Sequence, residues 1–192
     1  MPVTRLKDME KYLAAAIELG GDIAECGVFR GGSAYYIANF LASNGFTGEF
    51  HLFDTFSGMP ETDEKKDIHK KGDFADTNFE LVSNLMSKFP FVKIHKGLFS
   101  NTLRNVSEKR FSFVNVDCDI YSGVKECSEF FYERLVDGGV IVYDDYCSPS
   151  CPGAKSAVDE FAVGKDLLIP ELPPTGDFDY AVLKKNVENK DG

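Results

Sequence analysis

Apolar residues recur every three or four positions in five segments of the chain, and they alternate or run together in seven shorter segments. The first spacing is typical of a helix with one buried face, and the second is typical of a strand. Met9, Leu13, Ala16 and Ile17, for example, share one face of a helix that ends at two glycines. The pattern predicts helices over 6–21, 31–45, 78–89, 122–135 and 153–164, and strands over 22–29, 49–56, 92–99, 111–121, 138–146, 166–172 and 177–186.

The predicted strands and helices alternate along most of the chain, which favours a mainly parallel sheet with helices on both faces. The last two strands, separated by Pro173-Pro174, follow one another directly and predict an antiparallel pair at the edge of that sheet. We therefore expect one three-layer, Rossmann-like α/β domain over residues 1–192, with a mostly parallel seven-stranded sheet. Residues 58–78 show no periodicity and are rich in polar residues, so we expect a long loop there that acts as a lid.

Composition limits the function classes. The chain has 192 residues, of which 43% are hydrophobic and 27% charged, as in globular proteins. Its net charge of −10 argues against a nucleic-acid binder that neutralises phosphates. No apolar run is long enough to span a membrane, and the first residues lack a signal-peptide pattern, so we expect a cytoplasmic protein. The five cysteines are predicted to be free thiols, and nothing else in the sequence supports a metal or disulfide shared by Cys147 and Cys151.

The stretch "DIAECGVFRGGSA" combines a strand, a glycine turn and the start of a helix. Glycines allow a ligand to approach the backbone, and the free N–H groups of a helix N-terminus favour a phosphate or a carboxylate. The spacing departs from the dinucleotide pattern G-x-G-x-x-G, so it indicates NAD only weakly. A sharp strand-to-helix turn without a ligand is the alternative. The candidate ligand-binding residues are Glu25, Gly27, Gly31, Gly32 and Ser33.

Acidic residues lie at the ends of three of the predicted strands. Asp54, at the end of the second strand, is placed to accept hydrogen bonds from ribose hydroxyls. Asp117 ends the apolar part of one strand and Asp144-Asp145 end that of the next, so their carboxylates converge if the two strands are neighbours in a parallel sheet. Crowded carboxylates require a proton or a cation, and ligands that are all oxygen favour Mg²⁺, Mn²⁺ or Ca²⁺. A solvated acidic rim is the alternative interpretation.

Five motifs, "ECGVFRGGSA", "LFDTFSGMPETDE", "KGLFSNTL", "VDCDIYSG" and "GGVIVYDDY", resemble those of the macrocin O-methyltransferase (TylF-type) family in order and approximate spacing, over residues 21–161. The resemblance implies a class I methyltransferase that uses S-adenosylmethionine (SAM) and a divalent metal, Mg²⁺ or Mn²⁺, to methylate a hydroxyl of a sugar or another small molecule. It also allows a homodimer, although no apolar stripe in the sequence requires one. Gly123 departs from the family pattern, in which a Thr is common, and this leaves the acceptor class open.

The same resemblance assigns roles by position. It implies that the methionine end of SAM binds to Glu25 and to the turn from Gly27 to Ser33, which includes Gly31 and Gly32. The ribose would bind to Asp54, and Phe99, in "KGLFSNTL", would complete the cofactor site. The metal would bind to Asp117, Asp144 and Asp145.

An acceptor hydroxyl must lose its proton during methyl transfer, and Asp117 is the candidate base. His69, in the predicted lid, is a second candidate, whereas His51 and His95 lie within strands and are interpreted as structural. Two other functions stay open at this point. A nucleotide-sugar glycosyltransferase would use Asp117-Cys118-Asp119 as a metal-binding D-x-D motif, and a non-enzymatic module would bind a metal or nucleotide without turnover.

Overall fold

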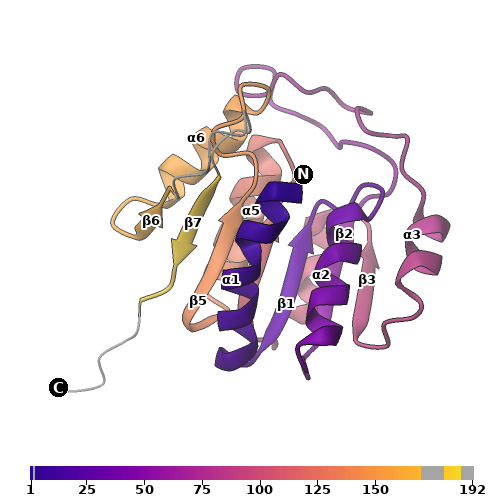
Figure 1. The fold of residues 1–192 in the computed structure, drawn as a ribbon. Coiled ribbons are helices and arrows are strands. Elements are labelled where there is room, and N and C mark those ends of the chain that lie inside the picture. The colour runs from indigo at the N-terminus through magenta and orange to yellow at the C-terminus, as the bar shows by residue number, and fades with distance from the viewer. Residues whose placement is uncertain (2, 170–179, 187–192) are drawn as a thin grey trace.

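The computed structural model describes residues 1, 3–169 and 180–186, and within them seven strands form one sheet (Figure 1). The strands are β1 Asp22–Cys26, β2 Phe50–Asp54, β3 Val92–Lys96, β4 Phe111–Val116, β5 Leu135–Tyr143, β6 Asp166–Leu168 and β7 Ala181–Lys184. The helices are α1 Val3–Leu19, α2 Gly32–Ser43, α3 Phe79–Met86, α4 Phe99–Thr102, α5 Tyr121–Tyr132 and α6 Pro152–Phe161, with the 3₁₀ turn η1 Leu103–Val106 after α4.

The strand order is β3-β2-β1-β4-β5-β7-β6. The first five strands in this order are mutually parallel, and β7 runs antiparallel to both β5 and β6. This arrangement confirms the predicted mostly parallel sheet with an antiparallel C-terminal strand. Pro173-Pro174, which the sequence places between the last two strands, lies outside the described residues.

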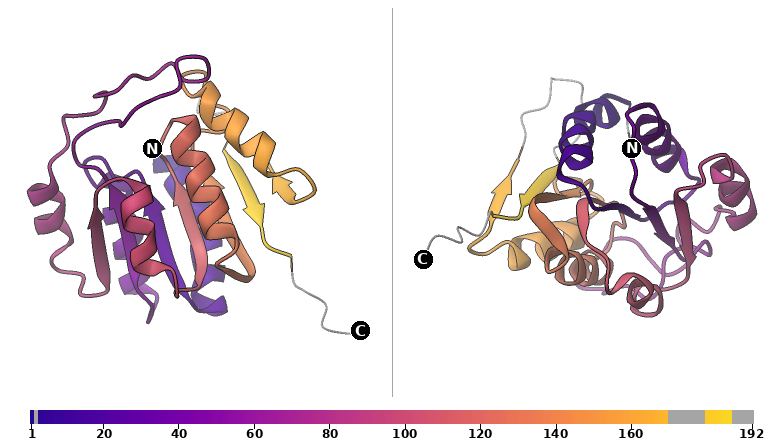
Figure 2. Two further views of the ribbon diagram at one scale, coloured as in Figure 1. Left: turned by 180° about the vertical axis from the view of Figure 1, so that it is seen from behind. Right: turned by 90° about the horizontal axis from the view of Figure 1, so that it is seen from below.

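Helices cover both faces of the sheet, with α1, α2 and α3 on one side and α4, α5 and α6 on the other (Figures 1 and 2). Successive side chains of a strand point to opposite faces of the sheet, so each strand contributes apolar side chains to both hydrophobic cores. In β2, Phe50 and Leu52 pack in the core beneath α1 and α2, and Phe53 packs in the core beneath α5. Both faces are therefore apolar, and polar side chains concentrate at the strand ends.

The predicted strands extend past the observed ones at their carboxyl ends, most clearly in β4, which ends at Val116 instead of residue 121, and two other features of the strands were wrong. The fifth strand begins at Leu135, before the glycine pair Gly138-Gly139, because these glycines form an irregularity inside the strand instead of preceding it. A Cβ on Gly139 would lie 2.9 Å from the carbonyl oxygen of Val136, so the backbone there leaves no room for a side chain. Phe99 begins the short helix α4 and does not end a strand.

Residues 58–78 contain neither helix nor strand, which confirms the predicted long loop. The loop crosses the carboxyl-end edge of the sheet, from β2 to α6 and back to α3 (Figure 1). Its two arms pair at the base, where Met59 N–H donates to the Asp73 carbonyl at 2.8 Å and Gly72 N–H to the Met59 carbonyl at 3.0 Å. No helix among the described residues has the length and apolar character needed to cross a bilayer.

Candidate active site

A cavity of about 1260 Å³ lies at the carboxyl ends of the parallel strands. It is walled by the glycine turn after β1, the ends of β2, β4 and β5, and residues of α1 and α2. Its volume exceeds that of a typical single-ligand pocket, so it has room for a cofactor together with an acceptor. The sequence-predicted residues that line it are Gly27, Gly32, Ser33, Asp54, Phe99, Asp117, Asp144 and Asp145, whereas Glu25, Gly31 and His69 do not.

The structure brings Asp117, Asp144 and Asp145 together, and we call these residues the acid trio. One carboxylate oxygen from each lies within 4.8 Å of the others. Adjacent parallel strands cause this, since β4 and β5 pair as far as Val116 and Tyr143 and the acids follow directly. Burial and the neighbouring carboxylates raise the pKa of Asp117 well above its ordinary value and raise that of Asp145 to about 8.

Two members of the acid trio accept hydrogen bonds from the chain. Arg5, on α1, donates from Nη1 to the Asp144 carboxylate at 2.7 Å and to the Asp144 carbonyl at 2.8 Å. Asp119 N–H donates to Asp145 Oδ2 at 3.1 Å. Within the described part of the chain, no side chain or backbone donor bonds the Asp117 carboxylate. Asp117 is thus the member of the trio with both oxygens available to a ligand.

Asp54 holds the glycine turn in place. Its Oδ2 accepts hydrogen bonds from Val28 N–H and Phe29 N–H, both at 2.8 Å, and its Oδ1 accepts one from Phe56 N–H at 2.6 Å. The bonds from Val28 and Phe29 hold the turn that follows β1, whereas the bond from Phe56 holds the chain just after β2. Because each carboxylate oxygen can accept more than one hydrogen bond, ribose binding by Asp54 stays a prediction.

Gly27 and Glu25 support the turn from below. A Cβ on Gly27 would lie 1.8 Å from the Asp117 carbonyl oxygen, so only glycine lets the ends of β1 and β4 approach this closely. Glu25 is fully buried and accepts hydrogen bonds from Asn115 Nδ2, at 3.1 Å, and from Ser33. Burial raises its pKa to about 7, and its Oε2 has no hydrogen-bond partner. Direct contact of Glu25 with a cofactor stays a prediction.

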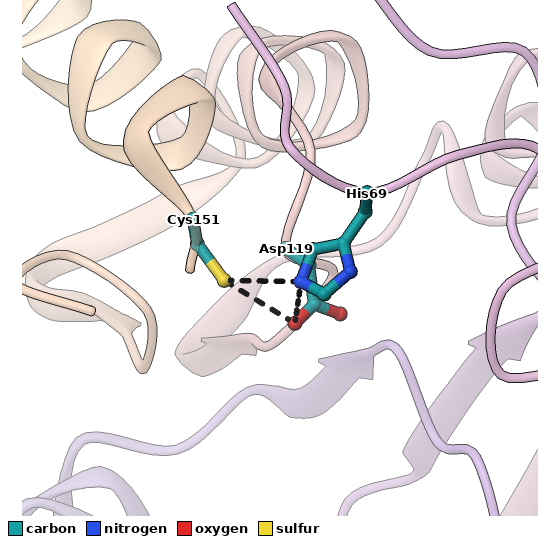
Figure 3. Close-up of side chains that lie close together, drawn as sticks. All are labelled: His69, Asp119 and Cys151. Atoms are coloured by element: carbon teal, nitrogen blue, oxygen red, sulfur yellow. Dashed lines mark hydrogen bonds and ion pairs between the residues drawn. The ribbon is translucent and has the colours of Figure 1, made fainter. Parts of the chain in front are cut away.

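His69 contacts a different pair of side chains. Its Nε2 lies 3.7 Å from Cys151 Sγ and 4.0 Å from Asp119 Oδ1, and Cys151 Sγ lies 3.5 Å from the same Asp119 oxygen (Figure 3). Burial, followed by the nearby Asp145 carboxylate, raises the pKa of the Cys151 thiol to about 12. No disulfide joins any of the five cysteines, all of which lie among the described residues.

The loop is fixed to the helices next to this group. Asp67 accepts a hydrogen bond from the backbone N–H of Tyr121 at 2.8 Å, at the N-terminus of α5. Lys66 pairs with Glu160 on α6 at 3.1 Å. A Cβ on Gly153 would lie 1.9 Å from Asp67 Oδ1, so the loop approaches α6 where only glycine fits. The loop therefore spans the cavity edge in a position that these contacts define.

A second polar group lies at the amino ends of β1 and β2, at the opposite end of the strands from the acid trio, and we call it the basal cluster. Asp22, Glu49 and His51 each place a ligand-type atom within 4.8 Å of the others. Lys109 neutralises both acids, at 3.3 Å from Asp22 and 2.6 Å from Glu49. His51 Nδ1 lies 3.0 Å from His95 Nε2, and burial lowers the pKa of His95 to about 4. Neither histidine lines the cavity, in line with the predicted structural role.

Sequence reasoning missed Arg5 and Asp67. Arg5 falls four residues before Met9 on the buried stripe of α1, so a charged residue at an apolar position was the available signal. Asp67 belongs to a loop without periodicity, and no sequence signal distinguishes it from the neighbouring acids.

A family model described as Macrocin-O-methyltransferase (TylF) matches residues 3–170 of the chain. The chain belongs to the TylF family. The match spans the glycine turn, the loop and the acid trio, and extends beyond the region in which the sequence motifs suggested the resemblance. It gives no support to the glycosyltransferase interpretation of Asp117-Cys118-Asp119.

Curated relatives of this TylF family member come from Streptomyces and Micromonospora species. It is 28% identical over 172 residues to the 8-demethyl-8-(2,3-dimethoxy-alpha-L-rhamnosyl)-tetracenomycin-C 4'-O-methyltransferase of Streptomyces olivaceus, covering 82% of this chain and 65% of the relative. It is 26% identical over 173 residues to the mycinamicin III 3''-O-methyltransferase of Micromonospora griseorubida, covering 82% and 67%. The TylF family member described here thus spans about two thirds of the length of these relatives.

Solved structures show the same fold. The O-methyltransferase NovP superposes with a TM-score of 0.80 at 22% identity, covering 96% of this chain and 81% of that one. The O-methyltransferase TomG from Streptomyces achromogenes, solved in complex with SAM, superposes with a TM-score of 0.62 at 15% identity, covering 94% and 80%. Both confirm the class I methyltransferase fold of this TylF family member.

Proposed function

We propose that this chain transfers a methyl group from SAM to a hydroxyl of a small molecule, a sugar or a glycosylated metabolite, with a divalent cation held by the acid trio. The observation that carries the proposal is the convergence of Asp117, Asp144 and Asp145 on one wall of a cavity whose other wall is the glycine turn. Family membership and the activities of the two relatives support the reaction class and the sugar acceptor.

The residues at the glycine turn fit SAM. Gly32, the first residue of α2, has open space where a side chain would point, and Ser33 follows it, so backbone N–H groups at this helix end can face the carboxylate of the methionine moiety. Asp54 is placed to accept hydrogen bonds from the ribose, and Phe99 forms part of the wall on the side of α4. Glu25 stabilises the turn from behind through Ser33.

The acid trio fits a hard divalent cation. Its ligand atoms are all oxygen, which favours Mg²⁺ or Mn²⁺ over zinc. Burial, together with repulsion between the neighbouring carboxylates, raises the pKa of Asp117 and of Asp145, and a cation between them would offset that repulsion. Such a cation, when bound, lowers the pKa of a coordinated hydroxyl and fixes its position.

The chain's own residues then divide the remaining work. Arg5 keeps Asp144 oriented, and Asp119 N–H does the same for Asp145. Asp117, which has no hydrogen-bond donor among the described residues, is our candidate for the group that accepts the acceptor's proton. His69 as a proton acceptor stays a prediction: His69 does not line the cavity, and its Nε2 lies near Cys151 and the cavity-lining Asp119.

The experiment is a methyl-transfer assay with isotopically labelled SAM and a panel of nucleotide-activated deoxysugars and glycosylated metabolites. We expect a labelled product that disappears with a chelator and returns with Mg²⁺ or Mn²⁺. Asp144→Ala should abolish transfer but still bind S-adenosylhomocysteine, because the glycine turn is intact. Asp159→Asn is the matched control, since Asp159 pairs with Lys155 on the surface of α6.

Full activity with chelator present would overturn the role of the metal. Tight binding of S-adenosylhomocysteine without transfer to any acceptor would instead favour the non-enzymatic module.

A further inference from the structure

His69, Asp119 and Cys151 come from three separate segments and converge (Figure 3). The group adjoins the acid trio, since Asp119 N–H donates to Asp145. His69 belongs to the loop, Asp119 to the turn between β4 and α5, and Cys151 precedes the first residue of α6. In sequence, Cys151 is 82 residues from His69 and 32 from Asp119. No part of the proposed methyl transfer needs an imidazole and a thiol to meet at this point.

The distances within this group match a transition-metal site. Zinc binds sulfur at about 2.3 Å and nitrogen or carboxylate oxygen at about 2.0–2.2 Å, with tetrahedral angles, so its ligand atoms lie about 3.3–3.6 Å apart. The observed separations are 3.5 Å between Cys151 Sγ and Asp119 Oδ1, 3.7 Å between Cys151 Sγ and His69 Nε2, and 4.0 Å between His69 Nε2 and Asp119 Oδ1. A small inward movement of the His69 side chain brings all three into range.

The other nitrogen of His69 is oriented as in known metal sites. Metal-bound histidines commonly donate their second ring N–H to a carboxylate, which fixes the direction of the ligating nitrogen. Here Nδ1 of His69 lies 3.5 Å from Asp73 Oδ2. Asp73 is itself held by Lys70 N–H at 2.9 Å, and this hydrogen bond lowers the pKa of Asp73 and keeps it ionised. The carboxylate thus turns Nε2 toward Cys151 and Asp119.

The ligand set distinguishes this group from the acid trio. The trio offers only hard oxygens, whereas a nitrogen, a sulfur and an oxygen together suit Zn²⁺ or Co²⁺ and not Mg²⁺. We propose that His69, Asp119 and Cys151 form a second metal site, specific for a zinc-like transition ion, which fastens the loop to the start of α6. Its proposed ligand atoms, His69 Nε2, Asp119 Oδ1 and Cys151 Sγ, are distinct from those of the acid trio, although Asp119 lines the cavity and its N–H donates to Asp145.

Cobalt reports this site directly, because a bound thiolate produces an intense charge-transfer absorption that carboxylates do not. Metal-free protein is titrated with Co²⁺ in the presence of excess Mg²⁺, which occupies sites of hard oxygens. We expect the thiolate-to-cobalt band to appear at one equivalent and to vanish when Zn²⁺ is added. Metal binding has to displace the thiol proton, so one proton is released for each ion bound.

Three variants test the ligands separately. Cys151→Ser should abolish the band, and His69→Asn should abolish or strongly weaken it. Asp73→Asn should weaken cobalt binding ~10–100-fold while the band keeps its shape, as expected for a residue that only orients a ligand. Cys147→Ser is the matched control, a half-buried cysteine four positions away and outside the group, and should keep the wild-type band.

Limited proteolysis provides an independent readout for the loop. Zn²⁺ should protect residues 58–78 from cleavage in wild type and in Cys147→Ser, and should not protect them in Cys151→Ser or His69→Asn. Cobalt binding without a thiolate band in wild type, or a band that persists in Cys151→Ser, would overturn the proposal. His69→Asn changes a loop side chain outside both hydrophobic cores, so this variant keeps the test valid if Cys151→Ser fails to fold.

Discussion

The acid trio lies at the carboxyl ends of the parallel strands and the basal cluster at their amino ends. In each group, three potential ligand atoms lie within 4.8 Å of one another. They differ in their neighbours. Lys109 and Lys93 accompany the acids of the basal cluster, and hydrogen bonds and the nearby cations hold the pKa of Glu49 below its ordinary value. Among the residues that the structure describes, only Arg5 forms an ion pair with the acid trio, and burial with the neighbouring carboxylates raises the pKa values of Asp117 and Asp145.

This difference in charge compensation indicates that the basal cluster stabilises the fold and that the acid trio is a site for a positively charged ligand. Compensated charges contribute to folding, whereas carboxylates that repel one another destabilise the ligand-free protein. Proximity of ligand-type atoms alone therefore does not identify a functional site. The balance of charge around those atoms distinguishes the two groups, and it favours the carboxyl ends of the strands as the candidate active site.

Asp145→Asn should give the largest functional effect. It removes one oxygen ligand and one negative charge from the acid trio, so we expect methyl transfer to fall by at least ~100-fold. The same change relieves repulsion, so thermal unfolding of the metal-free protein should occur at the same or a higher temperature. Measuring both on one preparation is decisive, because loss of activity together with a large loss of stability would point to a structural role instead.

Asp22→Asn should show the reverse behaviour. Its carboxylate accepts a hydrogen bond from Glu49 N–H at 2.8 Å and lies 3.4 Å from His51 Nε2. Losing this charge should reduce the free energy of unfolding by about 1–3 kcal/mol, measured by urea denaturation, because charged hydrogen bonds are replaced by weaker ones. Methyl transfer at a temperature where the variant is folded should match wild type; a loss comparable to that of Asp145→Asn would show that the two edges are not distinct.

The two regions also predict opposite pH dependence. Between pH 3.8 and about 8 the folded state holds the Asp145 proton more tightly than the unfolded state, so stability falls as pH rises. His95, with its pKa lowered from 6.5 to about 4, makes stability rise with pH, but only below 6.5. From pH 6.5 to 8, metal-free wild type should therefore lose stability, and Asp145→Asn should lose less. The free energy of unfolding of each protein is measured by urea denaturation at pH 6.5 and at pH 8. An equal loss of this free energy in both proteins would contradict the assignment.

Lys93→Ala should have the smallest effect. Lys93 Nζ lies 3.6 Å from Glu49 Oε1, and its side chain is 47% exposed. Exposed ion pairs contribute little, so the free energy of unfolding should change by no more than about 0.5 kcal/mol. The same urea measurement, with Asp22→Asn alongside, checks whether buried members of the basal cluster outweigh exposed ones.

The sequence predicted the fold and the acid trio well because both follow from local patterns. The period of two in the strands indicates a sheet buried on both faces, and an acid after each of two neighbouring parallel strands must come to the same edge. Predicting that Asp117, Asp144 and Asp145 converge required only that β4 and β5 be neighbours in the sheet.

The features that were missed depend on contacts between distant segments. Arg5 reaches Asp144 across 139 residues, and the meeting of His69, Asp119 and Cys151 depends on where a loop without periodicity comes to lie. The start of β5 was misplaced because glycines usually end strands, whereas Gly138-Gly139 forms an irregularity within one. The burial of Glu25 beneath the turn was also not predicted from the sequence, since burial is a property of packing, and its contact with a cofactor stays a prediction.

The central claim is that the acid trio holds a hard divalent cation beside the methyl donor. Crystals grown with Mn²⁺ and S-adenosylhomocysteine, and measured at the manganese absorption edge, test it most directly. The account predicts one strong anomalous peak within bonding distance of Asp117, Asp144 and Asp145, next to density for the cofactor at the glycine turn. Cofactor density without a manganese peak at the three carboxylates would contradict it.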